Sequence, residues 1–246
     1  MQNSFQISSP ARIHIGFLNL DLNSNRKFGS LGLTISNFSY EIKIEHFRSI
    51  KVVCENKLLE IKILKVIKYF RSKYLIPNFK ITILNQIPTH NGLGSGTQLI
   101  LSVGYLISKF CNLKISINQI ADIFKRGLRS GIGIESFKKG GFNIDAGKLE
   151  GSIAPPLNIL NLKWPSNWKI LLILDENLIG IHGKKEVMEF KELKKNKNSK
   201  YNTNFKSLVM NIIPGLLEKN FNEFSSGLRI IQDNMSRIFY GNSNKF

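Results

Sequence analysis

A glycine-rich stretch at residues 87–98, IPTHNGLGSGTQ, has the composition of a phosphate-binding loop. Its glycines let the backbone approach an anion and adopt positive φ where a turn requires it. Alternating apolar residues precede the loop and apolar residues at helical spacing follow it, so the predicted order is strand, loop, helix. At the start of such a helix, unpaired amides and the helix dipole hold phosphate. The residues assigned to phosphate binding are Gly92, Leu93, Gly94, Ser95, Gly96, Thr97 and Gln98.

An ordinary turn followed by a helix cap is the alternative interpretation of this loop, because short glycine motifs often occur without a ligand. No lysine follows the last glycine, which excludes a Walker loop, and the spacing is not that of a dinucleotide fingerprint. Ser95 does not stand in a G-x-S-x-G nucleophile motif, so acyl-transfer hydrolysis is disfavoured.

A second glycine-rich segment runs from residue 128 to residue 147, LRSGIGIESFKKGGFNIDAG. It contains five glycines, with Arg129 and Ser130 near its start and Asp145 near its end. Arginine pairs bidentately with phosphates and carboxylates, and aspartate binds Mg²⁺. The functional interpretation is a second loop built for close backbone approach. A β-turn leading into a strand at 142–144, with Asp145 as a turn residue, is the alternative.

Three of the four histidines stand in these unusual stretches or in a similar one. His14 lies in the first predicted strand, His90 lies beside the glycine loop, and His182 lies in ENLIGIHGKK. A single histidine is more often structural than catalytic, but three in such places make them candidates for binding or proton transfer. The chain has no HExxH or CxxC pattern, so the histidines do not indicate a metal site by spacing.

The elements that would position these residues alternate between strands and helices, which predicts an α/β (α+β) protein. A proline-containing stretch at 152–156 separates a predicted domain at 1–152 from a second one at 153–246. Predicted strands lie at 12–20, 31–35, 40–44, 79–86, 142–144 and 169–174, the last of them a buried strand, with a polar turn at 21–30. Predicted helices lie at 59–70, 99–110, 116–127, 205–212 with a break near Pro214, and 221–238. The first helix has an apolar stripe, and the third begins with Ser116 and Gln119 at the spacing of a capping box.

The composition of the 246-residue chain is that of a globular protein, with 42% hydrophobic residues and a net charge of +18. The lysines are spread along the whole sequence and no nucleic-acid-binding motif accompanies them, which argues against a dedicated nucleic-acid surface. An anionic small-molecule substrate suits the same charge. The sequence has no membrane-spanning run or secretory signal, and its two cysteines do not suggest a disulfide framework, so we expect a cytoplasmic protein.

Three motifs, PARIHIGFLNL, PTHNGLGSGTQ and SGIGIESFKKGG, resemble those of the GHMP kinase superfamily, whose glycine loop binds nucleotide phosphates. The resemblance implies a two-lobed α/β fold with mixed sheets, and here with a shortened C-terminal lobe. Within that superfamily the chain resembles the β-ribofuranosylaminobenzene 5′-phosphate synthase family of methanopterin biosynthesis. The features that carry this resemblance are His14, His90, Gln98, RSGIGIESFKKGGFNIDAG, the prolines at 155 and 156, and GIHGKKEVMEF at 180–190.

One departure from the superfamily's kinases favours the synthase. These kinases typically carry an aspartate base a few residues after the Ser-Gly of the second glycine segment, and Gly133 stands in that place. The resemblance then implies phosphoribosyl pyrophosphate and 4-aminobenzoate or 4-hydroxybenzoate as substrates, with loss of pyrophosphate and CO2. It also implies a homodimer. An ATP-dependent small-molecule kinase is the alternative, and ATP is expected as a ligand only in that case.

The resemblance also suggests roles for individual residues. His14, His90, Arg129 and Asp145 are the predicted catalytic residues, and Asp145 is the predicted ligand of Mg²⁺. The predicted substrate-binding residues are Arg12, Ser130, Gly131, Gly133, Gly140, Gly141 and His182. Family members continue into a third glycine motif that does not occur before Phe246, so a non-catalytic anion- or RNA-binding remnant is a further alternative.

Overall fold

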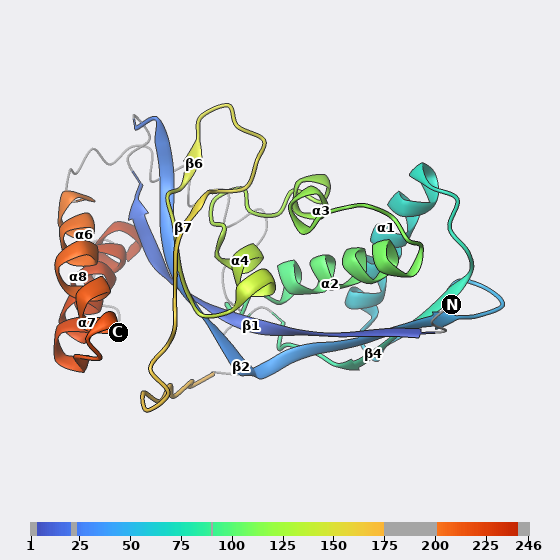
Figure 1. Cartoon of the computed structure of the whole chain (residues 1–246), viewed down its shortest axis with the longest axis horizontal. Coiled ribbons are helices and arrows are strands. Elements are labelled where there is room, and N and C mark those ends of the chain that lie inside the picture. The colour runs from blue at the N-terminus through green and yellow to red at the C-terminus, as the bar shows by residue number, and fades with distance from the viewer. Residues whose placement is uncertain (1–3, 21–23, 90, 175–200, 241–246) are drawn as a thin grey trace.

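The computed structural model describes residues 4–20, 24–89, 91–174 and 201–240, of which the side chains at 201, 202 and 238–240 are not described. The described chain forms a seven-stranded mixed sheet with the order β3-β4-β2-β5-β7, and β1 and β6 also pair with β2 (Figure 1). The strands are β1 (Ser4–Asn19), β2 (Arg26–His46), β3 (Lys51–Val53), β4 (Phe79–Asn85), β5 (Phe142–Asp145), β6 (Lys148–Leu149) and β7 (Asn158–Leu162).

The long strand β2 joins the two ends of this sheet. Its residues 41–46 pair with β4 and its residues 30–33 pair with β5, while β1 runs antiparallel along it. The β1–β2 register shifts between Pro10 and Ala11 and again between His14 and Gly16. Such irregularities bend a strand and redirect its side chains, so His14 lies where the ladder is interrupted.

Two groups of helices flank the sheet. The helices α1 to α4 lie together on one side of the part formed by β1, β2 and β4, and the helices α6 to α8 gather at the other end of the sheet (Figure 1). The first group is α1 (Lys57–Lys73), α2 (Ser95–Phe110), α3 (Ile117–Ile123) and α4 (Ile132–Lys139). The second group is α6 (Tyr201–Ser207), the π-helical turn η2 (Leu208–Ile212), α7 (Ile213–Leu217) and α8 (Phe221–Tyr240).

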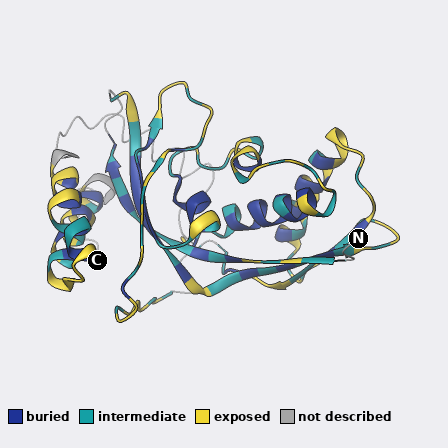
Figure 2. Cartoon of the chain, in the orientation of Figure 1, coloured by how far each residue is buried: buried dark blue, intermediate teal, exposed yellow. Residues whose placement is uncertain are grey.

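The apolar faces of these elements form two main cores, and the buried sides of the helices face the sheet (Figure 2). The first core packs α1 and α2 against β1, β2 and β4. The predicted apolar stripe of α1 is buried in it, at Leu59, Ile63, Val66, Ile67 and Phe70. The second core packs β5 against the C-terminal helices, with Phe142 and Phe224 in edge-to-face contact.

Most of the predicted elements are confirmed, and three predictions are wrong. The strands predicted at 31–35 and 40–44 are one continuous strand, β2, which also includes the end of the predicted polar turn. Residues 132–139 form α4 although no helix was predicted there. Residues 169–174 form no strand, and Leu171 and Ile173 are 84% and 85% exposed rather than buried.

The predicted helix break near Pro214 takes the form of the π-helical turn, after which Pro214 stands in the first turn of α7, where its missing N–H costs no hydrogen bond. The strand β7 lies beyond the predicted boundary at 152–153 and pairs with β5, which lies before it. The division into two domains therefore stays a prediction. In the part of the chain that the structure describes, no helix has the length and apolar character needed to cross a membrane.

Candidate functional site

The glycine loop is attached to β1 through Arg12. The backbone N–H of Arg12 donates to the carbonyl oxygen of Leu93 at 3.1 Å, and its Nη1 donates to the carbonyl oxygen of Gly92 at 2.6 Å. Gly94 has a φ of +76°, and a Cβ there would lie 3.1 Å from Cγ and Nε of Arg12. Glycine is therefore required at this position both for its backbone conformation and for the space that Arg12 occupies.

The loop leads directly into the first turn of α2. Gly94 is the N-cap, and its carbonyl oxygen accepts from the N–H groups of Thr97 and Gln98. Within the described residues no side chain caps α2, and its first turn contains no acidic residue. Because the first amides of a helix have no acceptor inside it, this end carries partial positive charge and suits an anion. The prediction of a strand, a loop and a helix in this order is confirmed.

The second glycine segment packs against the same turn. The Nε2 of Gln98 donates to the carbonyl oxygen of Gly133 at 2.8 Å, and both groups are buried. A Cβ at Gly133 would lie 3.2 Å from Cγ2 of Thr97, which is closer than most Cβ contacts in proteins. The two glycine-rich segments therefore meet, as the functional interpretation of both requires.

Asp145 lies at the start of α4, where its carboxylate is buried among donors. Its Oδ2 accepts from Oγ of Ser30 at 2.5 Å and from the N–H of Gly131 at 2.8 Å, and its Oδ1 accepts from the N–H of Gly147 at 2.9 Å. Oγ of Ser130 lies 3.5 Å from Oδ2 of Asp145 and 2.6 Å from Oγ of Ser30. Burial raises the pKa of Asp145, and the donors from Ser30, Gly147 and Gly131 oppose that rise.

These contacts occupy both carboxylate oxygens of Asp145, so the geometry favours a structural anion over a metal ligand. Within the described ranges no three His, Cys, Asp or Glu side chains form a group that would hold a metal ion. The role of Asp145 in catalysis and its role as a ligand of Mg²⁺ stay predictions.

His14 lies beside two arginines and is held neutral. Its pKa falls from 6.5 to about 3, because burial disfavours its charged form and the positive charges of Arg12 and Arg129 add to that effect. Its Nε2 is buried and has no hydrogen-bond partner among the described residues, while its ring packs on Phe17 at 4.6 Å between centroids. The backbone explains this neighbourhood, because His14 pairs with Gly32, and Ile132 at the start of α4 packs directly on Gly32.

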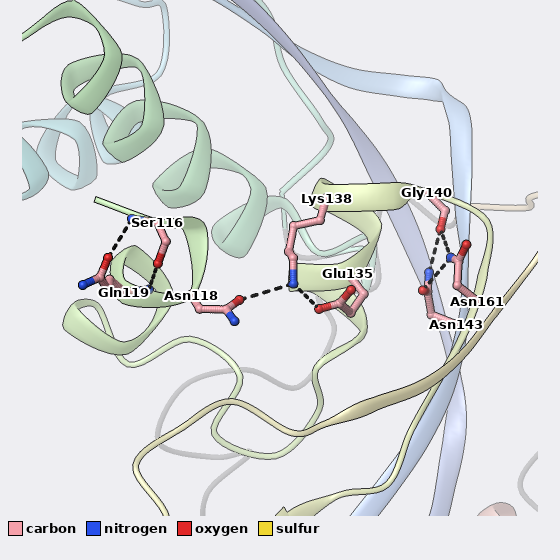
Figure 3. Close-up of polar contacts among 8 residues, drawn as sticks. All are labelled: Ser116, Asn118, Gln119, Glu135, Lys138, Gly140, Asn143 and Asn161. Carbon is pink, nitrogen blue, oxygen red and sulfur yellow. Dashed lines mark hydrogen bonds and ion pairs between the residues drawn. The ribbon is translucent and has the colours of Figure 1, made fainter. Parts of the chain in front are cut away.

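The predicted substrate-binding glycines Gly140 and Gly141 form a turn away from this cluster. The carbonyl oxygen of Gly140 accepts from Nδ2 of Asn143 and from Nδ2 of Asn161, whose side chains face each other across β5 and β7 (Figure 3). A Cβ at Gly141 would lie 2.8 Å from the carbonyl oxygen of Leu162. Close packing against the backbone of Leu162 accounts for Gly141, and a φ of +68° at the end of α4 accounts for Gly140. A role of either glycine in substrate binding stays a prediction.

A cavity of about 510 Å³ lies beside α4. Ile134, Glu135 and Lys138 line it, and Lys138 donates to Glu135 and to Asn118 (Figure 3). The double proline at 155–156, which was part of the family resemblance, also lines this cavity and not the glycine loop. The neighbouring capping box of Ser116 and Gln119 forms as predicted (Figure 3).

Two predicted site residues, His90 and His182, lie outside the described residues. Two residues of the site were not predicted from the sequence. They are Ser30, which donates to Asp145, and Arg126, whose Nη1 lies 3.9 Å from the position of a Cβ on Gly96. Ser30 stood in a predicted turn, and only the pairing of β2 with β5 brings it opposite Asp145. For Arg126 the only signal in the sequence is its position between the two glycine segments.

The structure resembles solved kinases of mevalonate metabolism at low sequence identity. Phosphomevalonate kinase from Streptococcus pneumoniae superposes with a TM-score of 0.65 at 11% identity, covering 96% of this chain and 80% of that chain. Mevalonate kinase from Methanococcus jannaschii superposes with a TM-score of 0.57 at 12% identity, with coverages of 96% and 80%. These likenesses show the fold alone.

Sequence comparison identifies the family. Residues 62–144 match the N-terminal domain of the GHMP kinases. A protein of Methanocaldococcus jannaschii named β-ribofuranosylphenol 5′-phosphate synthase is 31% identical over 251 residues, covering 92% of this chain and 76% of the relative. A protein of the same name from Methanothermobacter thermautotrophicus is 28% identical over 245 residues, covering 92% and 74%. The chain belongs to the β-ribofuranosylphenol 5′-phosphate synthase family, within the GHMP kinase superfamily.

Proposed function

We propose that the protein joins the ribosyl group of phosphoribosyl pyrophosphate to an aromatic carbon of 4-hydroxybenzoate or 4-aminobenzoate, with release of pyrophosphate and CO2, as a step of methanopterin biosynthesis. The observation that carries the proposal is the contact between Gly133 and Thr97, since Gly133 stands where a kinase has its aspartate base and any larger residue there would require Thr97 to shift. The names of the relatives specify a phenol, which favours 4-hydroxybenzoate as the acceptor.

The reaction needs no base, because no proton is gained or lost overall. The bond between the anomeric carbon and the pyrophosphate oxygen breaks, and both electrons leave with pyrophosphate. The ring carbon that carries the carboxylate forms the new bond to the anomeric carbon. The bond to the carboxylate then breaks, its electrons return to the ring, and CO2 departs. Groups that stabilise the departing negative charge are therefore what the site must supply.

The glycine loop is suited to the departing pyrophosphate. Arg12 binds the carbonyl oxygens of Gly92 and Leu93, so these acceptors are turned toward β1 and away from an incoming anion. The uncapped amides at the start of α2 then provide donors whose positions are already fixed before the charge develops. In this proposal Arg12 acts as a positioning residue for the loop.

His14 and Arg129 are assigned to the anionic groups of the substrates. The neutral imidazole of His14 donates or accepts a hydrogen bond without adding charge, and its buried Nε2 has a free position for such a bond within the described structure. Arg129 supplies a guanidinium that matches the geometry of a phosphate or carboxylate. A requirement for Mg²⁺ remains part of the proposal, but the geometry does not favour Asp145 as its ligand, because both carboxylate oxygens already accept hydrogen bonds within the fold.

The decisive experiment measures release of labelled CO2. The protein is incubated with phosphoribosyl pyrophosphate, Mg²⁺ and carboxyl-labelled 4-hydroxybenzoate or, in a parallel reaction, carboxyl-labelled 4-aminobenzoate. We expect release that depends on phosphoribosyl pyrophosphate, and the faster acceptor identifies the substrate. If folded protein releases no label with either acid, the proposed function is wrong.

The kinase alternative is supported by the fold of the relatives of known structure, and the remnant alternative by the net charge of +18. If the protein is a kinase, ATP should raise its melting temperature and donate phosphate to an alcohol. Binding of RNA with a steep salt dependence and without turnover would instead favour the remnant.

A further inference from the structure

The turn that ends α3 fixes the backbone at Arg126, whose side chain reaches the glycine loop. The helix ends in a Schellman motif, in which the N–H of Lys125 donates to the carbonyl oxygen of Asp122 and the N–H of Arg126 donates to that of Ala121. Lys125 has the left-handed conformation that the motif requires, with a φ of +53°. Gly127 follows with a φ of +74°, and a Cβ there would lie 2.7 Å from Ile134. The backbone on both sides of Arg126 is thus tightly defined.

The side chain of Arg126 extends from this turn to the start of α2. Its Nη1 lies 3.9 Å from the position that a Cβ would take on Gly96, which is the second residue of that helix. A larger residue at Gly96 would enter the space beside the guanidinium. The guanidinium therefore lies next to the amides that we assign to pyrophosphate.

Among the described residues, Arg126 has no anion beside it. Its Nε is buried without a hydrogen-bond partner in that part of the chain, and no carboxylate there forms an ion pair with it. Burial lowers the pKa of Arg126, and both burial and the charge of Arg126 lower the pKa of Lys62 on α1. A partly desolvated guanidinium thus lies at the positive end of α2, close enough to Lys62 to act on its charge. Such an arrangement is unfavourable until an anion joins it.

We propose that Arg126 binds a phosphate group of the ligand at the start of α2. The inference rests on the proposed function, because it adds a residue to the same pyrophosphate site. It gives the glycine loop two neighbouring arginines from different elements. Arg12 holds the loop from β1, and Arg126 reaches it from the end of α3.

The test compares Arg126→Gln with Lys125→Gln, which removes the same charge from the neighbouring exposed side chain. Binding of inorganic pyrophosphate is measured by titration calorimetry at constant ionic strength. We expect Arg126→Gln to bind at least about tenfold more weakly than the wild type, and Lys125→Gln to bind less than about twofold more weakly. Arg126→Lys, which keeps the charge but loses the planar fork, should lie between Arg126→Gln and the wild type.

The melting temperature without ligand separates binding from a structural role. Because Arg126 is partly desolvated and its Nε has no partner among the described residues, Arg126→Gln should melt at the wild-type temperature or above it. Wild-type affinity in Arg126→Gln, or a failure of this variant to fold, would overturn the inference. Wild-type affinity in Arg126→Lys would show that the fork makes no bidentate contact and would also count against it.

These outcomes are independent of the proposed reaction. If the wild-type protein binds pyrophosphate through Arg126 but releases no CO2 from either aromatic acid, the synthase proposal fails and the inference stands. If it releases CO2 while Arg126→Gln binds pyrophosphate normally, the inference fails and the synthase proposal stands.

Discussion

The two helices that follow the glycine-rich segments begin in the same way but differ in what neutralises their first turns. Both α2 and α4 have a glycine at the N-cap and no capping side chain in the described structure. At α4 the carboxylate of Asp145 accepts from the N–H of Gly131, and Glu135 adds an acidic residue to the first turn. At α2 there is no acidic residue, and Arg12 and Arg126 lie nearby instead.

This difference indicates which helix start is structural and which is available for a ligand. A positive helix end that already has a buried carboxylate is satisfied within the fold. A positive end flanked by cations is satisfied only when an anion arrives from outside. The glycine pattern alone does not separate the two cases, because both segments are rich in glycine. The two cases are separated by whether a carboxylate of the protein itself lies at the helix start, as that of Asp145 does at α4.

The largest expected effect comes from removing the internal anion at α4. Asp145→Ala leaves the donors of Ser30, Gly131 and Gly147 without their acceptor in a buried place. We expect the free energy of unfolding to fall by about 3–4 kcal/mol, since each unsatisfied buried donor costs about 1–3 kcal/mol. Chemical denaturation measures the change.

The matched control for that prediction is Asp122→Ala, which removes an exposed aspartate of α3 and should change stability by less than about 0.5 kcal/mol. If Asp145→Ala is as stable as the control but has lost synthase activity, Asp145 acts on the substrate or on Mg²⁺. The proposed contrast between the two helix starts would then be wrong.

The next effect concerns the contact between the two segments. Gly133→Asp restores the residue type of the kinases at a place where even a Cβ would lie 3.2 Å from Thr97. We expect a loss of about 2 kcal/mol in stability from overpacking, together with loss of CO2 release and no transfer of phosphate from ATP. Gly133→Ala adds only the Cβ and should lose less stability. A stable Gly133→Asp protein that phosphorylates an alcohol would show that the fold retains a kinase site.

The sequence predicted the elements that depend on local signals. The stripe of α1 and the capping box of Ser116 and Gln119 act within a few residues, and both are present. The helix α4 was missed because it has only eight residues, contains Gly133, and begins on a carboxylate supplied by β5. The apolar run at 169–174 resembles a buried strand in composition, but a strand also needs a pairing partner, which composition does not reveal.

The same reasoning explains which site residues were predicted. The glycine loop and Arg12 lie in continuous motifs, so the resemblance identified both. Ser30 and Arg126 become visible only after β2 pairs with β5 and after α3 packs beside α2, because each is far from its partner in sequence. For Asp145 the sequence found the residue, and only its four donors reveal what its carboxylate binds.

A smaller effect is expected from loosening the loop at α2. Arg12→Gln removes the bond from Nη1 to the carbonyl oxygen of Gly92, but the backbone bond to Leu93 remains. We expect pyrophosphate to bind about tenfold more weakly, which corresponds to about 1.4 kcal/mol. Arg12→Lys retains the charge and should recover part of the affinity. If both variants bind pyrophosphate as the wild type does, Arg12 does not position the loop.

The smallest expected effect is a pH dependence of stability that arises from His14. His14 lies between Arg12 and Arg129, and its pKa falls from 6.5 in the unfolded chain to about 3 in the folded one. Between pH 6.5 and pH 3, only the unfolded chain binds a proton at His14. The contribution of His14 to stability is therefore fully present above pH 6.5 and is lost as the pH falls toward 3. Between pH 6.5 and pH 5.5 the loss should be about 1 kcal/mol.

Denaturant titrations of the wild type and of His14→Gln at both pH values measure this contribution as the difference between their pH dependences. Equal pH dependences would show that His14 is not buried beside the two arginines, and the two helix starts would then act as separate sites.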